Sequence, residues 1–239
     1  MKKSTKLSAF TLIELLIVIA IIGILAGLMS GAIANVMSGA NATKIGNNGR
    51  NIINALMQTN QDREAAALSS LWPRTGGKLL KKTFANANEY FGILMEEEML
   101  SGISLPDFAG AGVTAATTVD ELKTDKKNIW SVLAGGSGSY TPIFWTRNLN
   151  LKNGDEKEFE SADADKPVNW GSGNEAKLSA KTNPFKAELA VVIRKGGAMQ
   201  VIKAKQLSDY TFLAGSTNTA DSIKIFEALG TGEDSEQEE

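Results

Sequence analysis

One acidic side chain, that of Glu14, stands inside a strongly apolar stretch at residues 10–29. A carboxylate is unstable in an apolar environment unless a cation lies within a few ångströms or water reaches it. The charged residues that precede the stretch are three lysines, Lys2, Lys3 and Lys6. These residue types favour charge pairing in the N-terminal part of the chain rather than acid–base catalysis.

The chain of 239 residues contains no histidine and no cysteine. The absence of histidine removes the commonest general base and the commonest zinc ligand, and the absence of cysteine removes thiol catalysis and disulfides. Any catalysis would depend on carboxylates, lysine or tyrosine alone, so we expect no enzyme activity, no cofactor and no metal. The formal net charge of −2 gives no reason to expect a nucleic-acid partner.

The apolar stretch is the element that positions Glu14. A helix over residues 10–30 would be about 30 Å long, which is the thickness of a bilayer's hydrocarbon core, so we predict a membrane span. The lysines before it are expected to keep the N-terminus in the cytoplasm and to send the rest of the chain outward. A cleaved secretory signal, with Ala32, Ile33 and Ala34 as its cleavage site, has a shorter apolar run. A plain membrane anchor leaves Glu14 unexplained.

Residues 8–14, Ser-Ala-Phe-Thr-Leu-Ile-Glu, are followed by an aliphatic run and closely resemble the N-terminal signature of type IV pilins and type II secretion pseudopilins. In that superfamily a prepilin peptidase removes a short basic leader, the new terminal residue is N-methylated, and the apolar helix forms the filament core. The resemblance implies cleavage between Ala9 and Phe10 and N-methylation of Phe10. The sequence departs from the family pattern at Ala9, where glycine is usual, and at Gly31, where many members have proline.

Two interpretations of Glu14 stay open. The resemblance implies an assembly role, in which the carboxylate pairs with the α-amine that cleavage creates on Phe10 of a neighbouring subunit. Alternatively, Glu14 is an acid in the first turn of a helix, where the helix dipole favours it and water partly reaches it.

The resemblance also implies an α+β, lollipop-like fold, in which a long N-terminal helix packs on a head with an antiparallel β-sheet. We expect a leader at residues 1–9, a transmembrane and filament-core helix at 10–30, its amphipathic continuation at 31–71, a head at 72–230 and an acidic disordered tail at 231–239. Trp72 and Pro73 are expected to end the helix. The glycines Gly39, Gly46 and Gly49 indicate either close packing with local softening in a filament or a break near Gly46.

Within the head, a helix is predicted from residue 89 to residue 100, capped by Asn86 or Asn88, with Phe91, Leu94 and Met95 facing inward. Three consecutive acids in it, residues 96–98, are expected to form its solvated face rather than a metal site. Strands are predicted at residues 129–134 and 140–146, the first of which could instead be a helix. A hairpin is predicted at residues 188–194 and 199–205, with a primed turn at Gly196 and Gly197. A last helix is predicted at residues 222–229.

The polar segment at residues 153–184 carries six acids between residues 155 and 165 and raises the hypothesis of a calcium site. It lacks the ordered pattern of an EF-hand loop, so a solvated loop is favoured.

The resemblance implies a structural subunit, a pilin or pseudopilin, of a type IV pilus-like or type II secretion filament. Its implied partners are copies of itself or other pilin-like subunits, the prepilin peptidase, an assembly platform with a cytoplasmic ATPase, and membrane lipid. It would cross the bacterial cytoplasmic membrane once, with the head in the periplasm or at the cell surface, before it enters the filament. The alternative is a single-pass, membrane-anchored binding module.

Overall fold

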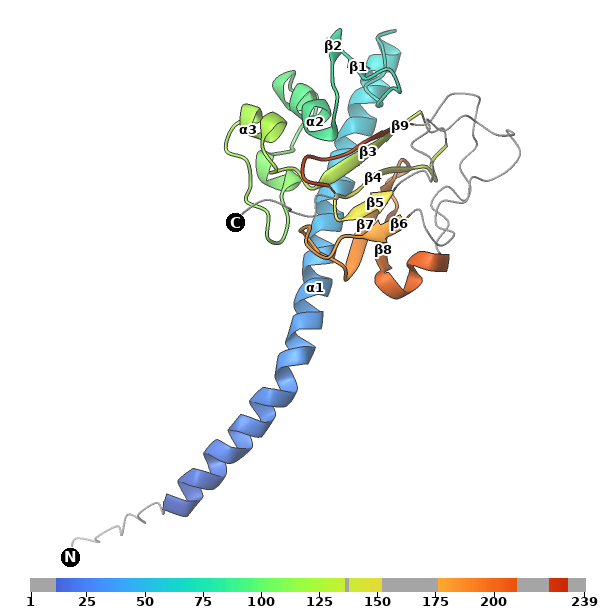
Figure 1. Ribbon diagram of the computed structural model, residues 1–239. Helices are drawn as coiled ribbons and strands as arrows, with labels where there is room; N and C mark the ends of the chain where they lie inside the picture. Colours follow the sequence, from blue (N-terminus) through green and yellow to red (C-terminus); the bar gives the residue numbers. More distant parts are fainter. Residues whose placement is uncertain (1–11, 136–137, 152–175, 210–223, 232–239) are drawn as a thin grey trace, which may run out of the picture. The chain divides into compact units, whose positions relative to one another are not determined.

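The computed structural model describes residues 12–135, 138–151, 176–209 and 224–231 (Figure 1). The chain divides into two compact units, Met1–Ala40 and Asn41–Glu239. The described part of the first unit is helical, and the second combines helices with an antiparallel β-sheet. The predicted α+β class is confirmed. The residues of the acidic segment at 155–165 and of the acidic tail, except Thr231, lie outside the described residues.

The long N-terminal helix α1 spans Leu12–Ala65. It continues through Gly46 and Gly49, so the alternative of a break near Gly46 is wrong. The helix ends before residue 71, where the sequence predicted its end.

A left-handed residue explains the earlier end of α1. Ala67 has a φ of 54°, the Leu68 N–H donates to the Arg63 carbonyl (2.8 Å), and the Ala67 N–H donates to the Glu64 carbonyl (3.0 Å). This is the Schellman arrangement, which satisfies the last carbonyls of a helix and reverses the chain. The turn at Ala67, rather than Trp72 and Pro73, therefore stops the helix.

Glycine is expected to be better than alanine at this left-handed position. Ala67→Gly should raise the free energy of unfolding by about 0.5–1 kcal/mol, because alanine pays a steric cost at positive φ that glycine does not. The matched control is Ala65→Gly, two residues earlier and still helical, which should lower it by about 1 kcal/mol. Urea unfolding followed by tryptophan fluorescence measures both changes. Equal losses in the two variants would contradict a role for the Schellman turn.

The main sheet has five strands in the order β8-β7-β4-β3-β9, and each neighbouring pair is antiparallel. The segment at 129–134 is therefore a strand, as predicted, and not the alternative helix. The strands are β3 (Trp130–Ala134), β4 (Pro142–Thr146), β7 (Leu189–Arg194), β8 (Met199–Lys203) and β9 (Lys224–Phe226).

The predicted hairpin is confirmed as β7 and β8, but its turn differs from the prediction. The Gly197 N–H donates to the Arg194 carbonyl and the Arg194 N–H donates to the Ala198 carbonyl, both at 2.8 Å. Gly197 has a φ of 83°, whereas Gly196 does not have a positive φ. A loop of this kind, with one left-handed residue at its end, is the three-residue hairpin connection rather than a primed two-residue turn.

The last predicted helix, residues 222–229, is wrong. Residues 224–226 form the edge strand β9, in which Ile225 pairs with Leu133 of β3. Phe226 packs in one hydrophobic cluster, with its ring centroid 4.6 Å from that of Phe84, while Ile225 packs against the other cluster. Successive side chains point to opposite faces in a strand and not in a helix. This short segment forms a strand because it pairs with the edge of the sheet.

The helix α2 spans Ala87–Glu96, and Asn86 caps it by accepting a hydrogen bond from the Glu89 N–H (2.9 Å). Phe91 and Leu94 are fully buried, as predicted, and Met95 is half-buried. The remaining elements are β1 (Lys78–Leu79), β2 (Lys82–Thr83), the 3-10 helix η1 (Leu105–Phe108), α3 (Val119–Thr124), β5 (Leu149–Leu151), β6 (Ala176–Leu178) and the 3-10 helix η2 (Ala204–Asp209).

The acids at the end of α2 form ion pairs on the surface. Lys82 reaches Glu96 at 2.9 Å and Glu97 at 2.5 Å, and Lys123 reaches Glu96 at 3.0 Å. Hydrogen bonds from these two lysines lower the pKa of Glu96. In the part of the chain that the structure describes, no cluster of acids is arranged to hold a metal ion. Glu96 and Glu98 are exposed and Glu97 is partly exposed, so the three acids lie at the surface as predicted, but α2 ends at Glu96 and not at residue 100.

The head has hydrophobic clusters on both faces of the sheet. The larger cluster joins residues 41–65 of α1 and the helix α2 to one face. The smaller cluster lies on the other face and includes residues of β5, β6 and η2. Every residue of the three central strands β3, β4 and β7 is consequently buried.

Two glycines allow α1 to lie close against the sheet. A Cβ atom at Gly49 would be 2.7 Å from both the Trp130 Cη2 and the Ile193 Cγ1 atoms, and one at Gly46 would be 1.7 Å from the Met199 Sδ atom. Real Cβ contacts are not this short, so a side chain at either position would push the helix or its neighbours apart. Close packing within the head accounts for Gly46 and Gly49.

A buried asparagine joins the polar backbone of several segments. The Asn88 Nδ2 atom donates to the carbonyls of Leu122 (2.9 Å) and Asp125 (2.8 Å). Its Oδ1 atom accepts from the Leu229 N–H (3.0 Å) and from Asn128 Nδ2 (3.2 Å). Asn88 thereby connects α2, the end of α3, the start of β3 and the segment after β9.

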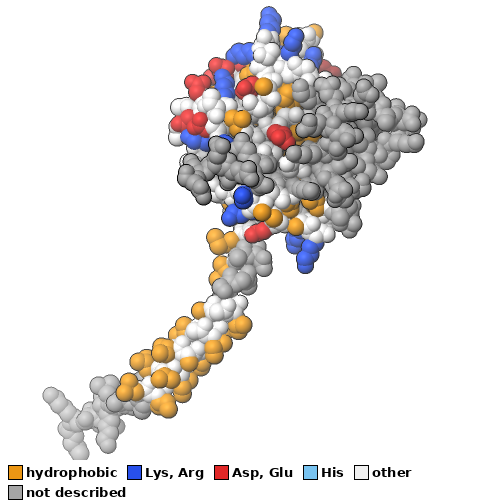
Figure 2. Space-filling view, in the orientation of Figure 1, with side chains coloured by type: hydrophobic (Ala, Val, Ile, Leu, Met, Phe, Trp, Pro, Cys, Tyr) orange, Lys and Arg blue, Asp and Glu red, His pale blue; other side chains and the backbone are white. Residues whose placement is uncertain are grey.

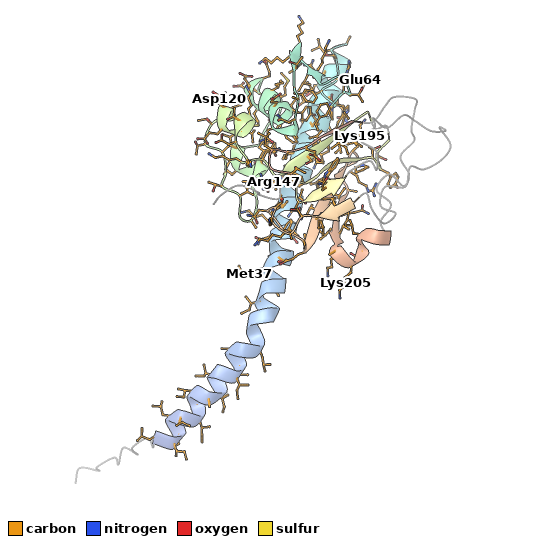
Figure 3. All side chains as sticks on the ribbon, viewed as in Figure 1. Met37, Glu64, Asp120, Arg147, Lys195 and Lys205 are labelled. Carbon is orange, nitrogen blue, oxygen red and sulfur yellow. The ribbon has the colours of Figure 1, made fainter. Side chains whose placement is uncertain are left out.

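Arg147, labelled in Figure 3, continues this network. Its Nη1 atom donates to the carbonyls of Lys126 (2.8 Å) and Leu229 (3.0 Å), and its Nε atom donates to the Asn183 carbonyl (3.0 Å). Arg147 is 8 % exposed, so these carbonyls are satisfied by a side chain rather than by bulk water.

Candidate functional site

The site predicted from the sequence lies in the N-terminal unit. Glu14 is exposed and occupies the first turn of α1. Ala9 and Phe10, the predicted cleavage site, lie outside the described residues, as do the leader lysines Lys2, Lys3 and Lys6. Glu14 is thus the predicted site residue that the structure describes. It lies at a helix N-terminus, where the helix dipole favours an acid.

The apolar side chains that follow Glu14 are exposed (Figure 2). The fractional exposure of the large ones in the first unit ranges from 45 % for Val18 to 88 % for Leu12. They include every position from Leu15 to Ile19, which is more than one helical turn, so they cover all sides of the helix. An apolar surface of this extent requires a partner or an apolar environment.

Among the residues that the structure describes, no helix combines the length and the apolarity needed to cross a bilayer. The span predicted at residues 10–30 is therefore not found in the described residues, which include residues 12–30 of it.

Comparison with known proteins bears on the same segment. Residues 6–30 match the prokaryotic N-terminal methylation motif. The chain carries a prepilin-type N-terminal signal. The methylation motif includes Ala9, Phe10 and Glu14 and confirms the resemblance seen in the sequence. No curated protein matches the chain, and no solved structure matches it.

The methylation motif sets the broad role of the chain. It is the signal that pilin-like and pseudopilin precursors carry, and it favours a structural subunit. It implies processing by a prepilin peptidase and assembly with other pilin subunits, and it indicates a membrane-anchored precursor whose head is exported.

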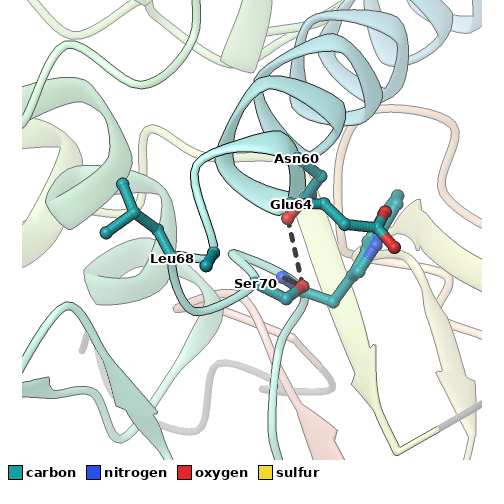
Figure 4. A pocket seen from close by; sticks show the side chains of 6 residues that line it. Asn60, Glu64, Leu68 and Ser70 are labelled. Atoms are coloured by element: carbon teal, nitrogen blue, oxygen red, sulfur yellow. Dashed lines mark hydrogen bonds between the residues drawn. The ribbon is translucent and has the colours of Figure 1, made fainter.

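The described part of the head has cavities at its surface. One cavity, of about 480 Å³, lies at the end of α1 and is shown in Figure 4. Ser70 Oγ donates to Asn60 Oδ1 there (3.0 Å), and the Leu71 N–H donates to the same oxygen (2.7 Å). The Asn60 amide thus holds the segment after α1 in place. The cavity is lined by Asn60, Glu64, Ala67, Leu68, Ser70 and Trp72.

A lysine from the β7–β8 loop lies on the same tryptophan. Lys195 Nζ is 4.7 Å from the centre of the Trp72 ring, within the range of a cation–π contact. Partial burial lowers the pKa of Lys195. The contact ties the loop to the segment that follows α1, so we assign it a structural role. The N-terminal segment with Glu14 stays the candidate functional site.

Proposed function

We propose that the chain is a pilin or pseudopilin that is cleaved between Ala9 and Phe10, N-methylated on Phe10 and assembled into a filament through its N-terminal helix. One observation carries the proposal: residues 6–30 match the methylation motif, and α1 within them exposes apolar side chains on all sides. The motif supports processing, and the exposed surface supports burial against neighbouring helices.

The chemistry of assembly follows from the two charges at the processed end. Cleavage removes the lysines of the leader and creates an α-amine on Phe10, one helical turn before Glu14. In the proposed filament the Glu14 carboxylate pairs with the α-amine of a neighbouring subunit. Because water is excluded from a bundle of apolar helices, either charge left alone there would be strongly unfavourable. The pair therefore sets the axial register between subunits.

Burial against neighbouring helices keeps the apolar side chains of the N-terminal helix out of water in the filament. Each leucine or isoleucine side chain left in water would cost about 1.5–3 kcal/mol, so the helix must pass from lipid directly to other subunits. Before assembly we propose that the precursor is anchored in the cytoplasmic membrane, with the head outside and lipid around the N-terminal segment. An assembly platform with a cytoplasmic ATPase would move the subunit from lipid into a pilus-like or a type II secretion filament.

Processing is tested by the intact mass and N-terminal sequence of the protein extracted from membranes of cells that contain a prepilin peptidase. We expect a chain that begins with N-methylated Phe10 and lacks residues 1–9. The control is the same extraction from cells without the peptidase. A chain that keeps its leader in both strains would overturn the proposal.

Glu14→Ala is expected to reduce the amount of filament at least about tenfold while the protein still enters the membrane fraction. Loss of one partner from a buried ion pair costs about 3–5 kcal/mol, which corresponds to more than a tenfold change in an equilibrium. Glu64→Ala, an exposed acid near the other end of α1, is the matched control and should assemble normally. Sheared filaments are quantified by sedimentation and immunoblotting. Normal assembly of Glu14→Ala would favour a membrane-anchored binding module instead.

A further inference from the structure

A second cavity of the head is surrounded by positive charge. It has a volume of about 180 Å³ and lies in the segment that follows α1 and in the β1–β2 hairpin. Figure 2 shows Lys and Arg side chains at the end of the head where Figure 1 places β1 and β2. The lining residues are Ser69, Ser70, Arg74, Lys78, Leu79, Leu80 and Lys81.

Three of the lining side chains are cations without a carboxylate partner among the described residues. Arg74, Lys78 and Lys81 are exposed, and none of them takes part in an ion pair there. The adjacent Lys82 differs, since it is paired with Glu97 and Glu96, and the hydrogen bonds that it donates to these acids raise its pKa. The cavity therefore concentrates positive charge in a protein whose formal net charge is −2.

The backbone at Lys81, one of these cations, and at its neighbour Leu80 is left-handed. Leu80 and Lys81 form the turn between β1 and β2, and their φ angles are 50° and 66°. Two successive residues at positive φ form a primed two-residue hairpin turn, in which a residue other than glycine pays about 1–2 kcal/mol. Leu79 is 3 % exposed and anchors the hairpin in the core, which keeps Lys78 and Lys81 at the cavity.

The chain itself contains a segment of matching charge. Residues 231–239, Thr-Gly-Glu-Asp-Ser-Glu-Gln-Glu-Glu, include acidic side chains at five positions and no base. The acids in the segment at 155–165 are instead interrupted by Lys157. Two or three carboxylates opposite three unpaired cations would form charge-assisted contacts that neither surface makes alone.

We propose that the cavity lined by Arg74, Lys78 and Lys81 binds the acidic segment 231–239 of a second copy of this chain. The path of the chain favours a second copy over the same one. Phe226 contacts Phe84, next to the hairpin, whereas Gly230 lies against Lys126 and not against a residue that lines the cavity. The contact joins heads and does not depend on cleavage at Ala9.

The neighbouring cavity limits where the acidic segment binds. Glu64 lines the 480 Å³ cavity on the other side of Ser70, and its carboxylate repels acids. Ser69 differs from Ser70 in that its hydroxyl donates no hydrogen bond among the described residues, whereas Ser70 Oγ donates to Asn60. The acidic segment is thus confined to the side of Ser69 and Arg74.

Cysteine cross-linking tests the contact, because the chain contains no native cysteine. Full-length Ser69→Cys, which keeps all charges, is mixed in mild detergent with a differently tagged full-length Glu236→Cys and oxidised. We expect a disulfide between the two tags, identified by mass spectrometry. Adding Lys78→Glu and Lys81→Glu to the Ser69→Cys copy should lower its yield at least about tenfold, whereas Lys205→Glu with Lys203→Glu, the same change of charge at the end of β8, should not.

Two results would overturn the proposal. The first is a cross-link of equal yield in both charge-reversed copies, which would show that the cations at the cavity do not attract the segment. The second is an intramolecular disulfide in Ser69→Cys/Glu236→Cys that forms at high dilution and displaces the intermolecular one, which would assign the cavity to the tail of the same copy. Because the leader can be present or absent in this assay, neither result depends on N-terminal processing.

Discussion

Asn88→Ala is expected to lower the free energy of unfolding of the head by about 3–5 kcal/mol. Asn88 is fully buried, and all four of its hydrogen-bonding positions are occupied. Its removal leaves the Leu122 carbonyl and the Leu229 N–H without their partner, at about 1–3 kcal/mol for each group that water cannot reach. The Asp125 carbonyl and the Asn128 amide each lose one of two hydrogen bonds. The loss is measured by urea unfolding of the full-length protein, followed by tryptophan fluorescence.

The matched control is Asn86→Ala, two residues earlier. Asn86 caps α2 through a hydrogen bond to one backbone N–H, so its loss should cost about 1 kcal/mol. Asn88→Asp separates hydrogen bonding from side-chain size, because aspartate fills the same space but presents an acceptor to the carbonyls of Leu122 and Asp125. We expect Asn88→Asp to be at least as unstable as Asn88→Ala. Equal losses in the Asn86 and Asn88 alanine variants would contradict the role assigned to the network.

Gly49→Ala is expected to destabilise the head by about 2 kcal/mol, although alanine is the better helix former. The new methyl group would meet the Trp130 ring and Ile193 at 2.7 Å, and both side chains are fully buried. Overpacking of a filled core costs about 1–3 kcal/mol, and two contacts at 2.7 Å place this substitution at the upper end of that range. The gain of about 1 kcal/mol in helix propensity leaves a net loss of about 2 kcal/mol. The urea midpoint reports the change.

Two further glycines of α1 calibrate this effect. A Cβ atom at Gly39 would have no neighbouring atom within 4 Å. Gly39→Ala should therefore leave the urea midpoint unchanged or raise it slightly. Gly46→Ala meets the flexible Met199 side chain, which can move, and should be less harmful than Gly49→Ala. If all three substitutions changed stability alike, the changes would reflect helix propensity rather than contact between α1 and the sheet.

These substitutions separate the two ends of α1. Asn88 and Gly49 act within the second unit, Asn41–Glu239, whereas Glu14 lies in the first, Met1–Ala40. Variants of Asn88 and Gly49 are therefore expected to change the stability of the head and to leave N-terminal processing intact. Glu14→Ala is expected to do the reverse.

The amino-acid sequence alone was sufficient for features that depend on neighbouring residues. The N-terminal signal is read from contiguous residues, which is why Ala9, Phe10 and Glu14 could be named and why residues 6–30 match the methylation motif. Asn86 is a cap because its side chain reaches a backbone N–H three residues ahead. The β7–β8 hairpin follows from two apolar runs around adjacent glycines. Each signal is local, so it needs no knowledge of the rest of the fold.

The tertiary structure was needed wherever the partner is distant in the chain. Residues 224–226 become a strand because β3 offers a free edge, and Ile225 pairs with Leu133. Gly49 is required because Trp130 and Ile193 approach α1, and Asn88 is satisfied by the Leu229 N–H, 141 residues away. Propensity and periodicity carry no information about such partners, since the free energy of these contacts exists only once the chain has brought them together.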